Sequence, residues 1–106
     1  MKNKITNRTQ VYRAIYYSGF DWSKTRTGAN DSYKLVDKNS QHTIYLDHIY
    51  DEELKMDQLI AKTNDALSEK EIDRFSRLCY KIMRRTRNLG IQQDLFELAE
   101  QQQEEK

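Results

Sequence analysis

Residues 20–47 read FDWSKTRTGANDSYKLVDKNSQHTIYLD, and this stretch decides the fold class because its residue types favour strands separated by turns. The turns are GAND at 28–31 and DKNS at 37–40, both rich in residues that turn geometry prefers. The expected strands are 22–27, 32–37 and 42–47. In the second strand Tyr33 and Leu35 alternate with more polar neighbours. We expect a three-stranded antiparallel sheet with one face covered by helices and the other in water.

A helix is expected before this sheet, over residues 7–18. Val11, Ala14 and Ile15 recur at helical spacing, and Thr6 or Thr9 can serve as the N-cap. Gly19 supplies the stop signal at the C-terminal end.

Helical periodicity returns after the sheet, and it predicts two to three helices. The first covers about 51–67, with Asp51, Glu52 and Glu53 in its first turn, where the helix dipole favours acids. Its apolar stripe is Leu54, Met56, Leu59, Ile60, Thr63 and Leu67. The second begins at Ser68, which forms a capping box with Glu71, and ends at Gly90. A last helical segment covers 91 to about 101.

The expected fold is therefore α+β: an N-terminal helix, a three-stranded antiparallel sheet, then two to three C-terminal helices. The 106 residues suit one domain. In this interpretation 7–67 form an α-β-β-β-α unit, 68–101 are a helical extension, and 102–106 are a disordered tail.

Composition excludes several classes of protein. No apolar run approaches the roughly 18 residues that a membrane span needs, and no signal-like apolar region follows Met1. Cys79 is the single cysteine, so an internal disulfide or a multi-cysteine metal site is excluded. We expect a cytoplasmic protein without membrane contact. The absence of proline, with many Lys, Asn and Tyr, suggests an AT-rich bacterial genome or its phages and plasmids.

Charge is distributed in blocks, although the formal net charge is only +1. Residues 51–75 carry eight acidic and four basic residues, whereas 76–93 carry five basic residues and no acid. Such a chain can present a basic surface to a polyanion while remaining near neutrality.

The basic block falls on the helix expected at 68–90. Its apolar residues form one broad face, and its cations form a separate stripe: Lys70, Arg74, Arg77, Lys81 and Arg84, flanked by Arg85. Three interpretations remain open. The stripe follows a nucleic-acid backbone, it meets an acidic protein, or it is a solvated face paired with acids of the same chain. Arginine outnumbers lysine there, which suits bidentate recognition of phosphate or carboxylate.

No catalytic or metal site is expected. His42 and His48 lie on a strand and at its exit and do not converge, and the chain has no glycine-rich phosphate loop. Cys79 lies on the apolar helix face, where a buried, unreactive thiol is expected. We expect neither enzymatic activity nor a cofactor.

The order of elements over residues 10–62 resembles the HicA-type ribonuclease toxins, whose α-β-β-β-α fold is like a double-stranded-RNA-binding domain. The matching pieces are Gly19-Phe20, Gly28-Ala29-Asn30, Tyr33, the segment 43–48 ending in His48, and Glu53-Leu54. That family has Gly-Ser-His where this chain has Gly28-Ala29-Asn30, so its catalytic histidine is missing here. The resemblance implies the scaffold and an affinity for nucleic acid without the nuclease.

Two functions are carried forward. The first is a non-catalytic protein that binds DNA, RNA or a nucleoprotein complex, as a phage or plasmid accessory or regulatory factor. Its binding residues would be the stripe Lys70, Arg74, Arg77, Lys81, Arg84 and Arg85, with Lys24, Arg26 and Lys34 of the sheet as a second region. The alternative is a mobile-element inhibitor of a host effector protein, such as an anti-CRISPR, that uses the acidic blocks 51–73 and 94–105 to mimic nucleic acid.

Overall fold

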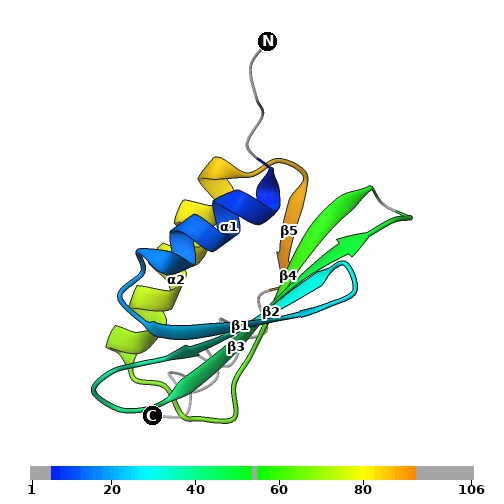
Figure 1. Cartoon of the computed structure of the whole chain (residues 1–106). Coiled ribbons are helices and arrows are strands. Elements are labelled where there is room, and N and C mark those ends of the chain that lie inside the picture. Colours follow the sequence, from blue (N-terminus) through cyan, green and yellow to red (C-terminus); the bar gives the residue numbers. More distant parts are fainter. Residues whose placement is uncertain (1–5, 54, 93–106) are drawn as a thin grey trace.

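The computed structural model describes residues 6–53 and 55–92, which place two helices on one face of a five-stranded sheet (Figure 1). The elements are α1 (Asn7–Tyr16), β1 (Asp21–Thr27), β2 (Asn30–Val36), β3 (Thr43–Asp51), β4 (Met56–Lys62), α2 (Glu69–Arg85) and β5 (Leu89–Gln92). The fold is α+β, as expected. Neither helix of the described ranges is long and apolar enough to cross a membrane.

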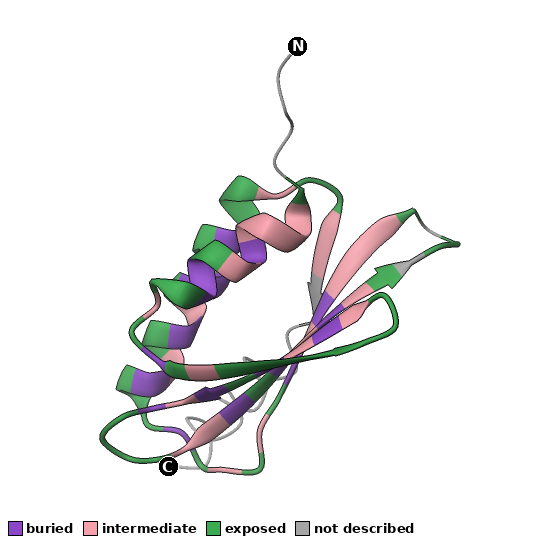
Figure 2. Ribbon diagram, in the orientation of Figure 1, coloured by how far each residue is buried: buried purple, intermediate pink, exposed green. Residues whose placement is uncertain are grey.

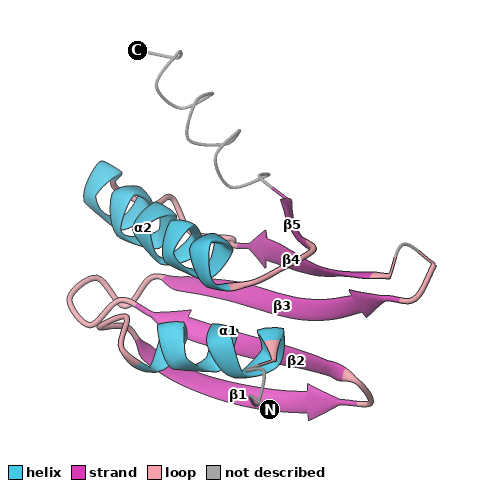
Figure 3. Cartoon of the chain, turned by 90° about the horizontal axis from the view of Figure 1, so that it is seen from above, coloured by secondary structure: helices cyan, strands magenta, loops and turns pink. Residues whose placement is uncertain are grey.

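The sheet has the strand order β1-β2-β3-β4-β5 and is mixed, because it contains both antiparallel and parallel pairs. The first four strands form an antiparallel meander, and β5 pairs with β4 in parallel. α2 is therefore the crossover that a parallel pair requires. Seen from above, α1 and α2 lie side by side over the sheet, with α1 nearer to β1 and β2 (Figure 3).

The core lies between the helices and one face of the sheet, where the buried positions gather (Figure 2). α1 contributes Val11, Ala14 and Ile15, and α2 contributes Phe75, Leu78, Cys79 and Ile82. The strands contribute Tyr33, Leu35, Ile44, Leu46, Leu59 and Ala61, with Phe20 and Leu67 from the connections. Strand residues alternate between this covered face and an open face, in agreement with the alternation at Tyr33 and Leu35.

The prediction of three strands and of a helix over 51–67 was wrong. Residues Met56–Lys62 form β4, which pairs with β3 so that Leu59 and Ala61 point into the core. Lys55 has a positive φ of 54° and belongs to the connection that turns the chain back. The acids assigned to a first helical turn lie at this hairpin instead. The apolar residues there fit both periods, and pairing with β3 decides between them. Leu54 lies outside the described residues.

The capping box was predicted correctly, but the end of its helix was not. The Ser68 hydroxyl accepts a hydrogen bond from the Glu71 amide, and the Glu71 carboxylate accepts one from the Ser68 amide. α2 ends at Arg85 because Thr86 is extended, and Gly90 belongs to β5. The helix predicted for 91–101 is also wrong at its start, since Ile91 and Gln92 are strand residues.

The remaining part of that predicted helix, 93–101, and the tail 102–106 lie outside the described residues. The described elements run α-β-β-β-β-α-β, so the α-β-β-β-α order implied by the toxin resemblance is not the order found.

Candidate nucleic-acid interface

The cations of α2 divide into two groups. Lys70, Lys81, Arg84 and Arg85 are exposed and form no ion pair with another described residue. Arg74 and Arg77 have acidic partners within the fold. Only the first group, with Arg77 as argued below, is free to meet a ligand.

Arg74 has a structural role. Its Nη1 lies 3.0 Å from Oδ2 of Asp37, a buried carboxylate, and its guanidinium lies 5.7 Å from the centroid of the Phe20 ring. Hydrogen bonds from the Ser40 and Asn39 amides and the nearby Arg74 together lower the pKa of Asp37, although desolvation opposes this. This arginine therefore ties α2 to the β2–β3 connection, and the sequence stripe that included it is interrupted.

Arg77 remains available although it is paired. Its Nε lies 2.9 Å from Oδ2 of Asp73, one helical turn earlier, and both side chains are exposed. Such an exposed i,i+4 pair is worth only about 0.3–0.5 kcal/mol and is screened by salt, so a phosphate can replace the carboxylate.

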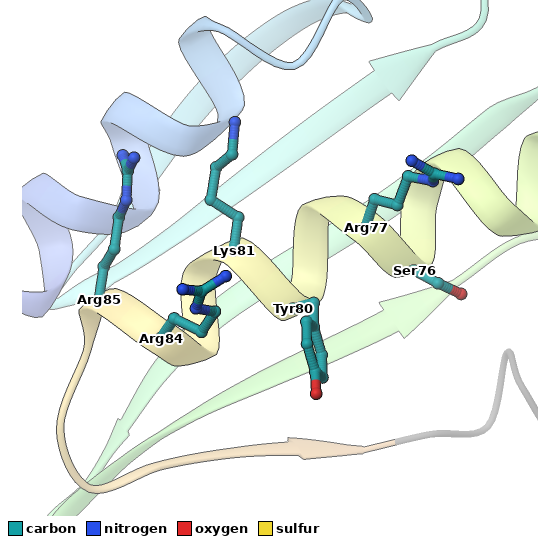
Figure 4. A pocket seen from close by; sticks show the side chains of 6 residues that line it. All are labelled: Ser76, Arg77, Tyr80, Lys81, Arg84 and Arg85. Carbon is teal, nitrogen blue, oxygen red and sulfur yellow. The ribbon is translucent and has the colours of Figure 1, made fainter.

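The basic surface of α2 is defined by Arg77, Lys81, Arg84 and Arg85, which line a surface hollow of about 560 Å³ together with Ser76 and Tyr80 (Figure 4). Figure 4 shows Lys81 and Arg85 projecting to the side of α2 on which α1 lies, whereas Tyr80 projects to the opposite side. From Arg77 to Arg85 the helix rises by about 12 Å, a length that spans about three to four phosphates of one strand along a duplex axis.

α1 adds to the same side of the molecule. The two helices run antiparallel, because the Asn7 side chain at the start of α1 exchanges two hydrogen bonds with the backbone of Arg87 just beyond α2. Arg13 and Tyr17 at the other end of α1 are exposed, and Tyr17 is 75% accessible. An exposed aromatic ring beside cations suits stacking on a base.

The second predicted contact region does not exist as one surface. Lys24 lies over the ring of Tyr12 at 5.2 Å from its centroid, and Arg26 binds the buried carboxylate of Asp31 at 3.1 Å. Lys34 alternates with Tyr33, which is buried on the helix side, so Lys34 lies on the open face of the sheet. Two of the three residues thus face the helices, and the third faces the opposite way.

The acids of block 51–73 are spread over the described structure. Glu52 and Glu53 lie at the β3–β4 hairpin, while Asp57 contacts His48 and Asp65 binds the amide of Thr43. Glu71 is buried, so the described part of the chain does not gather these acids into one surface. Block 94–105 lies outside the described residues.

Glu71, Ser40 and His42 form a polar cluster that fixes the β2–β3 connection to the start of α2. His42 Nδ1 lies 3.1 Å from both carboxylate oxygens of Glu71, and the Ser40 hydroxyl donates to Oε2. Burial opposes ionisation of Glu71, but hydrogen bonds from Ser40, Ser68 and His42 outweigh it and lower its pKa to about 2. The Glu71 carboxylate raises the pKa of His42 in return. This cluster was not predicted from the sequence, in which His42 was interpreted as a lone strand residue.

A second histidine cluster was also missed. His48 Nε2 lies 2.8 Å from Oδ2 of Asp57, and the two side chains are only 6% and 14% exposed. They border a cavity of about 390 Å³ at the N-terminal end of α1. The signal that could have revealed the pair is the alternation in 56–62, because a strand there places Asp57 and Leu59 on the same face as His48.

Cys79 is buried, and burial raises the pKa of its thiol to about 12, as expected of an unreactive cysteine. Among the residues that the structure describes, no three His, Cys, Asp or Glu side chains are grouped so as to hold a metal ion.

Comparison with protein-family models, with curated proteins and with solved structures finds no match to this chain.

Proposed function

We propose that this protein binds nucleic acid without catalysis, through the basic surface of α2. One observation carries the proposal: Lys81, Arg84 and Arg85 are exposed within two turns of one helix, and no described acid pairs with them. Fixed cations at this spacing neutralise successive phosphates and release condensed counterions, which drives association. Tyr80 lines the same hollow and Tyr17 ends α1; both are exposed and suit contacts with sugars and bases.

The proposal predicts binding to generic sequences with a strong dependence on salt. If the four cations each neutralise one phosphate, the slope of log K against log salt is about −3.6 for duplex and about −2.8 for a single strand. Affinity then falls roughly 50- to 150-fold between about 50 and 200 mM salt. Fluorescence anisotropy with labelled duplex and single-stranded oligonucleotides measures this. No detectable binding at the lower salt concentration contradicts the proposal.

Matched charge removal locates the surface. The double variant Lys81→Gln with Arg85→Gln is expected to reduce the slope by about 1.4 to 1.8, because two phosphate contacts are lost. The control, Lys34→Gln with Lys62→Gln, removes the same charge from the opposite, open face of the sheet and is expected to leave the slope unchanged. Equal losses in both double variants would show that overall charge, and not α2, drives binding.

Arg74→Gln provides a second control. It removes a cation of the same helix whose partner is Asp37, so it is expected to lower stability by about 1 kcal/mol while leaving the salt slope intact. The inhibitor alternative has less support, because the described acids of block 51–73 lie in separate places, and Asp57, Asp65, Glu71 and Asp73 have partners within the fold.

A further inference from the structure

The cavity of about 390 Å³ lies where α1 begins, next to the last residues of β3 and the first residues of β4. Arg8, His48, Tyr50 and Asp57 are among the residues that line it. Its size falls within the range of small-molecule sites in proteins and exceeds what one nucleobase occupies. The cavity therefore has room for a base, and its chemistry decides which ligand fits.

The cavity is not built for an isolated anion. Arg8 Nε lies 3.0 Å from Oδ2 of Asp31, which is fully buried, and the Arg8 guanidinium also donates to the Ala29 carbonyl. Arg8 thus already has an ion-pair partner within the fold, although it shares that carboxylate with Arg26. Asp57 adds a carboxylate to the wall, and a carboxylate repels phosphate.

The wall of the cavity instead offers hydrogen-bond acceptors, namely the carboxylate oxygens of Asp57. An ionised carboxylate can only accept hydrogen bonds, so His48 carries hydrogen on Nε2 and donates it to Oδ2 of Asp57. This bond fixes the orientation of the Asp57 carboxylate and leaves Oδ1 without a described partner. A fixed acceptor in a mostly buried site selects ligands that carry N–H donors.

Tyr50 supplies an aromatic surface at the same place. Tyr50 and Asp57 are register partners on β3 and β4, so their side chains leave the sheet on the same face and lie next to each other. The Tyr50 side chain is 46% exposed, so one part of it is open to a ligand. A planar ligand can stack on this ring while its edge reaches Asp57.

The cavity is also connected to the basic surface of α2. Asn7 lines the cavity, and it holds the backbone of Arg87 through two hydrogen bonds, at distances of 2.6 and 3.1 Å. Arg87 follows Arg84 and Arg85 by only two or three positions. A strand lying on these cations reaches the cavity at the end of α2.

We propose that this cavity binds an unstacked nucleobase that carries an amino group, guanine above all, with the base stacked on Tyr50 and its N–H donors on Asp57. The proposal rests on the proposed function, because the base belongs to the strand that the basic surface of α2 holds. Guanine presents two adjacent N–H donors to a carboxylate, and cytosine or adenine presents an amino group. Uracil and thymine present one N–H between two carbonyl acceptors, which face the carboxylate unfavourably.

The test uses single nucleotides, which report on the cavity without the α2 contacts. Guanosine 5′-monophosphate, uridine 5′-monophosphate and inorganic phosphate are titrated separately into the ¹⁵N-labelled protein. Guanosine monophosphate is expected to shift the Ala29 and Tyr50 amides and to bind roughly tenfold or more tightly than the uridine nucleotide. Equal binding of the two nucleotides, or the same shifts with phosphate alone, would overturn the proposal.

Two variants separate stacking from edge recognition. Tyr50→Ala is expected to weaken the binding of guanosine monophosphate roughly tenfold. Tyr50→Phe is expected to leave this affinity unchanged, because stacking needs the ring and not the hydroxyl. Asp57→Asn is expected to remove the preference for guanosine over uridine. If Asp57→Asn proves unfolded by circular dichroism, the Tyr50 pair alone decides, since Tyr50 is half exposed and its replacement leaves the core intact.

The outcomes for the cavity and for the α2 surface can be told apart. The Lys81→Gln, Arg85→Gln double variant is expected to lose oligonucleotide affinity and keep guanosine monophosphate binding. If oligonucleotides bind with the full salt slope but the nucleotide does not bind, the cavity proposal fails and the proposed function stands. If the nucleotide binds but oligonucleotides do not, the proposed function fails and nucleotide binding by the cavity stands.

Discussion

Replacing Glu71 by Gln is expected to remove an acid-sensitive part of the protein's stability. The Glu71 side chain is 8% exposed and accepts hydrogen bonds from Ser40 and from the Ser68 amide, while His42 lies against both of its oxygens. These contacts hold its pKa at about 2, below the ordinary 4.5, despite the opposing effect of burial. Gln keeps the shape and the hydrogen bond to the Ser68 amide and loses the charge.

The magnitude follows from the two pKa values. Because the pKa of Glu71 is lower in the folded state than in the unfolded state, its ionisation stabilises the fold. This stabilisation is complete above pH 4.5 and is lost as the pH falls towards 2. The whole interval corresponds to about 3 kcal/mol, of which about 2 kcal/mol is lost between pH 7 and pH 3. The Glu71 contribution alone makes the wild-type protein lose about 2 kcal/mol more than Glu71→Gln over this range, and protonation of His42, which has the opposite sign, offsets part of this difference.

Urea denaturation followed by circular dichroism at the two pH values measures this difference. Glu69→Gln is the matched control, because it removes an exposed carboxylate from the same first turn of α2. The wild-type and Glu69→Gln proteins are expected to show the same acid loss. Equal losses in the wild-type and Glu71→Gln proteins would refute the reasoning.

The partner histidine gives an independent readout with the opposite sign. The Glu71 carboxylate raises the pKa of His42, so the contribution of His42 is complete below 6.5 and fades as pH rises through its folded pKa. In Glu71→Gln the ring proton resonances of His42 are expected to titrate at a lower pH than in the wild-type protein. An unchanged titration would show that Glu71 does not act on the imidazole.

Three further predictions concern buried groups. Asp31→Asn is expected to cost about 2 to 3 kcal/mol in urea denaturation, because its fully buried carboxylate binds Arg8 and Arg26; a loss below about 0.5 kcal/mol contradicts this. Tyr33→Phe is expected to leave stability unchanged or raise it by up to about 1 kcal/mol, since the buried hydroxyl has no hydrogen-bond partner among the described residues; a clear loss would reveal one. Cys79 is expected to react with iodoacetamide at about pH 8 roughly 10³-fold more slowly in the folded than in the unfolded protein, because burial raises its pKa to about 12; similar rates would show an accessible thiol.

Local sequence signals correctly predicted the helix caps and the turn that depend on nearby residues. Thr6 caps α1, Ser68 and Glu71 cap α2, and Gly28, with a φ of 62°, turns β1 into β2. Each of these features depends on residues within four positions of one another. Such features survive folding because no distant partner is needed to form them.

The errors fall where a distant partner decides. Residues 56–62 carry apolar side chains that fit a helix or a strand, and the exposed edge of β3 selects the strand by pairing Leu46 with Ala61. β5 depends in the same way on β4, which lies about thirty positions earlier in the chain. The free and paired cations of α2 could not be told apart for the same reason, because Asp37, the partner of Arg74, lies 37 positions away.

The parallel pairing of β5 with β4 has a consequence for dynamics. β5 has four residues and pairs with β4 through the α2 crossover, so we expect it to be the last strand to form and the first to open. Its opening leaves one edge of β4 unpaired and also releases the backbone around Arg87 that Asn7 holds. A nucleic acid strand spanning the α2 cations and α1 would therefore act as a clamp on the end of the sheet, slowing amide exchange in β5, which it does not touch.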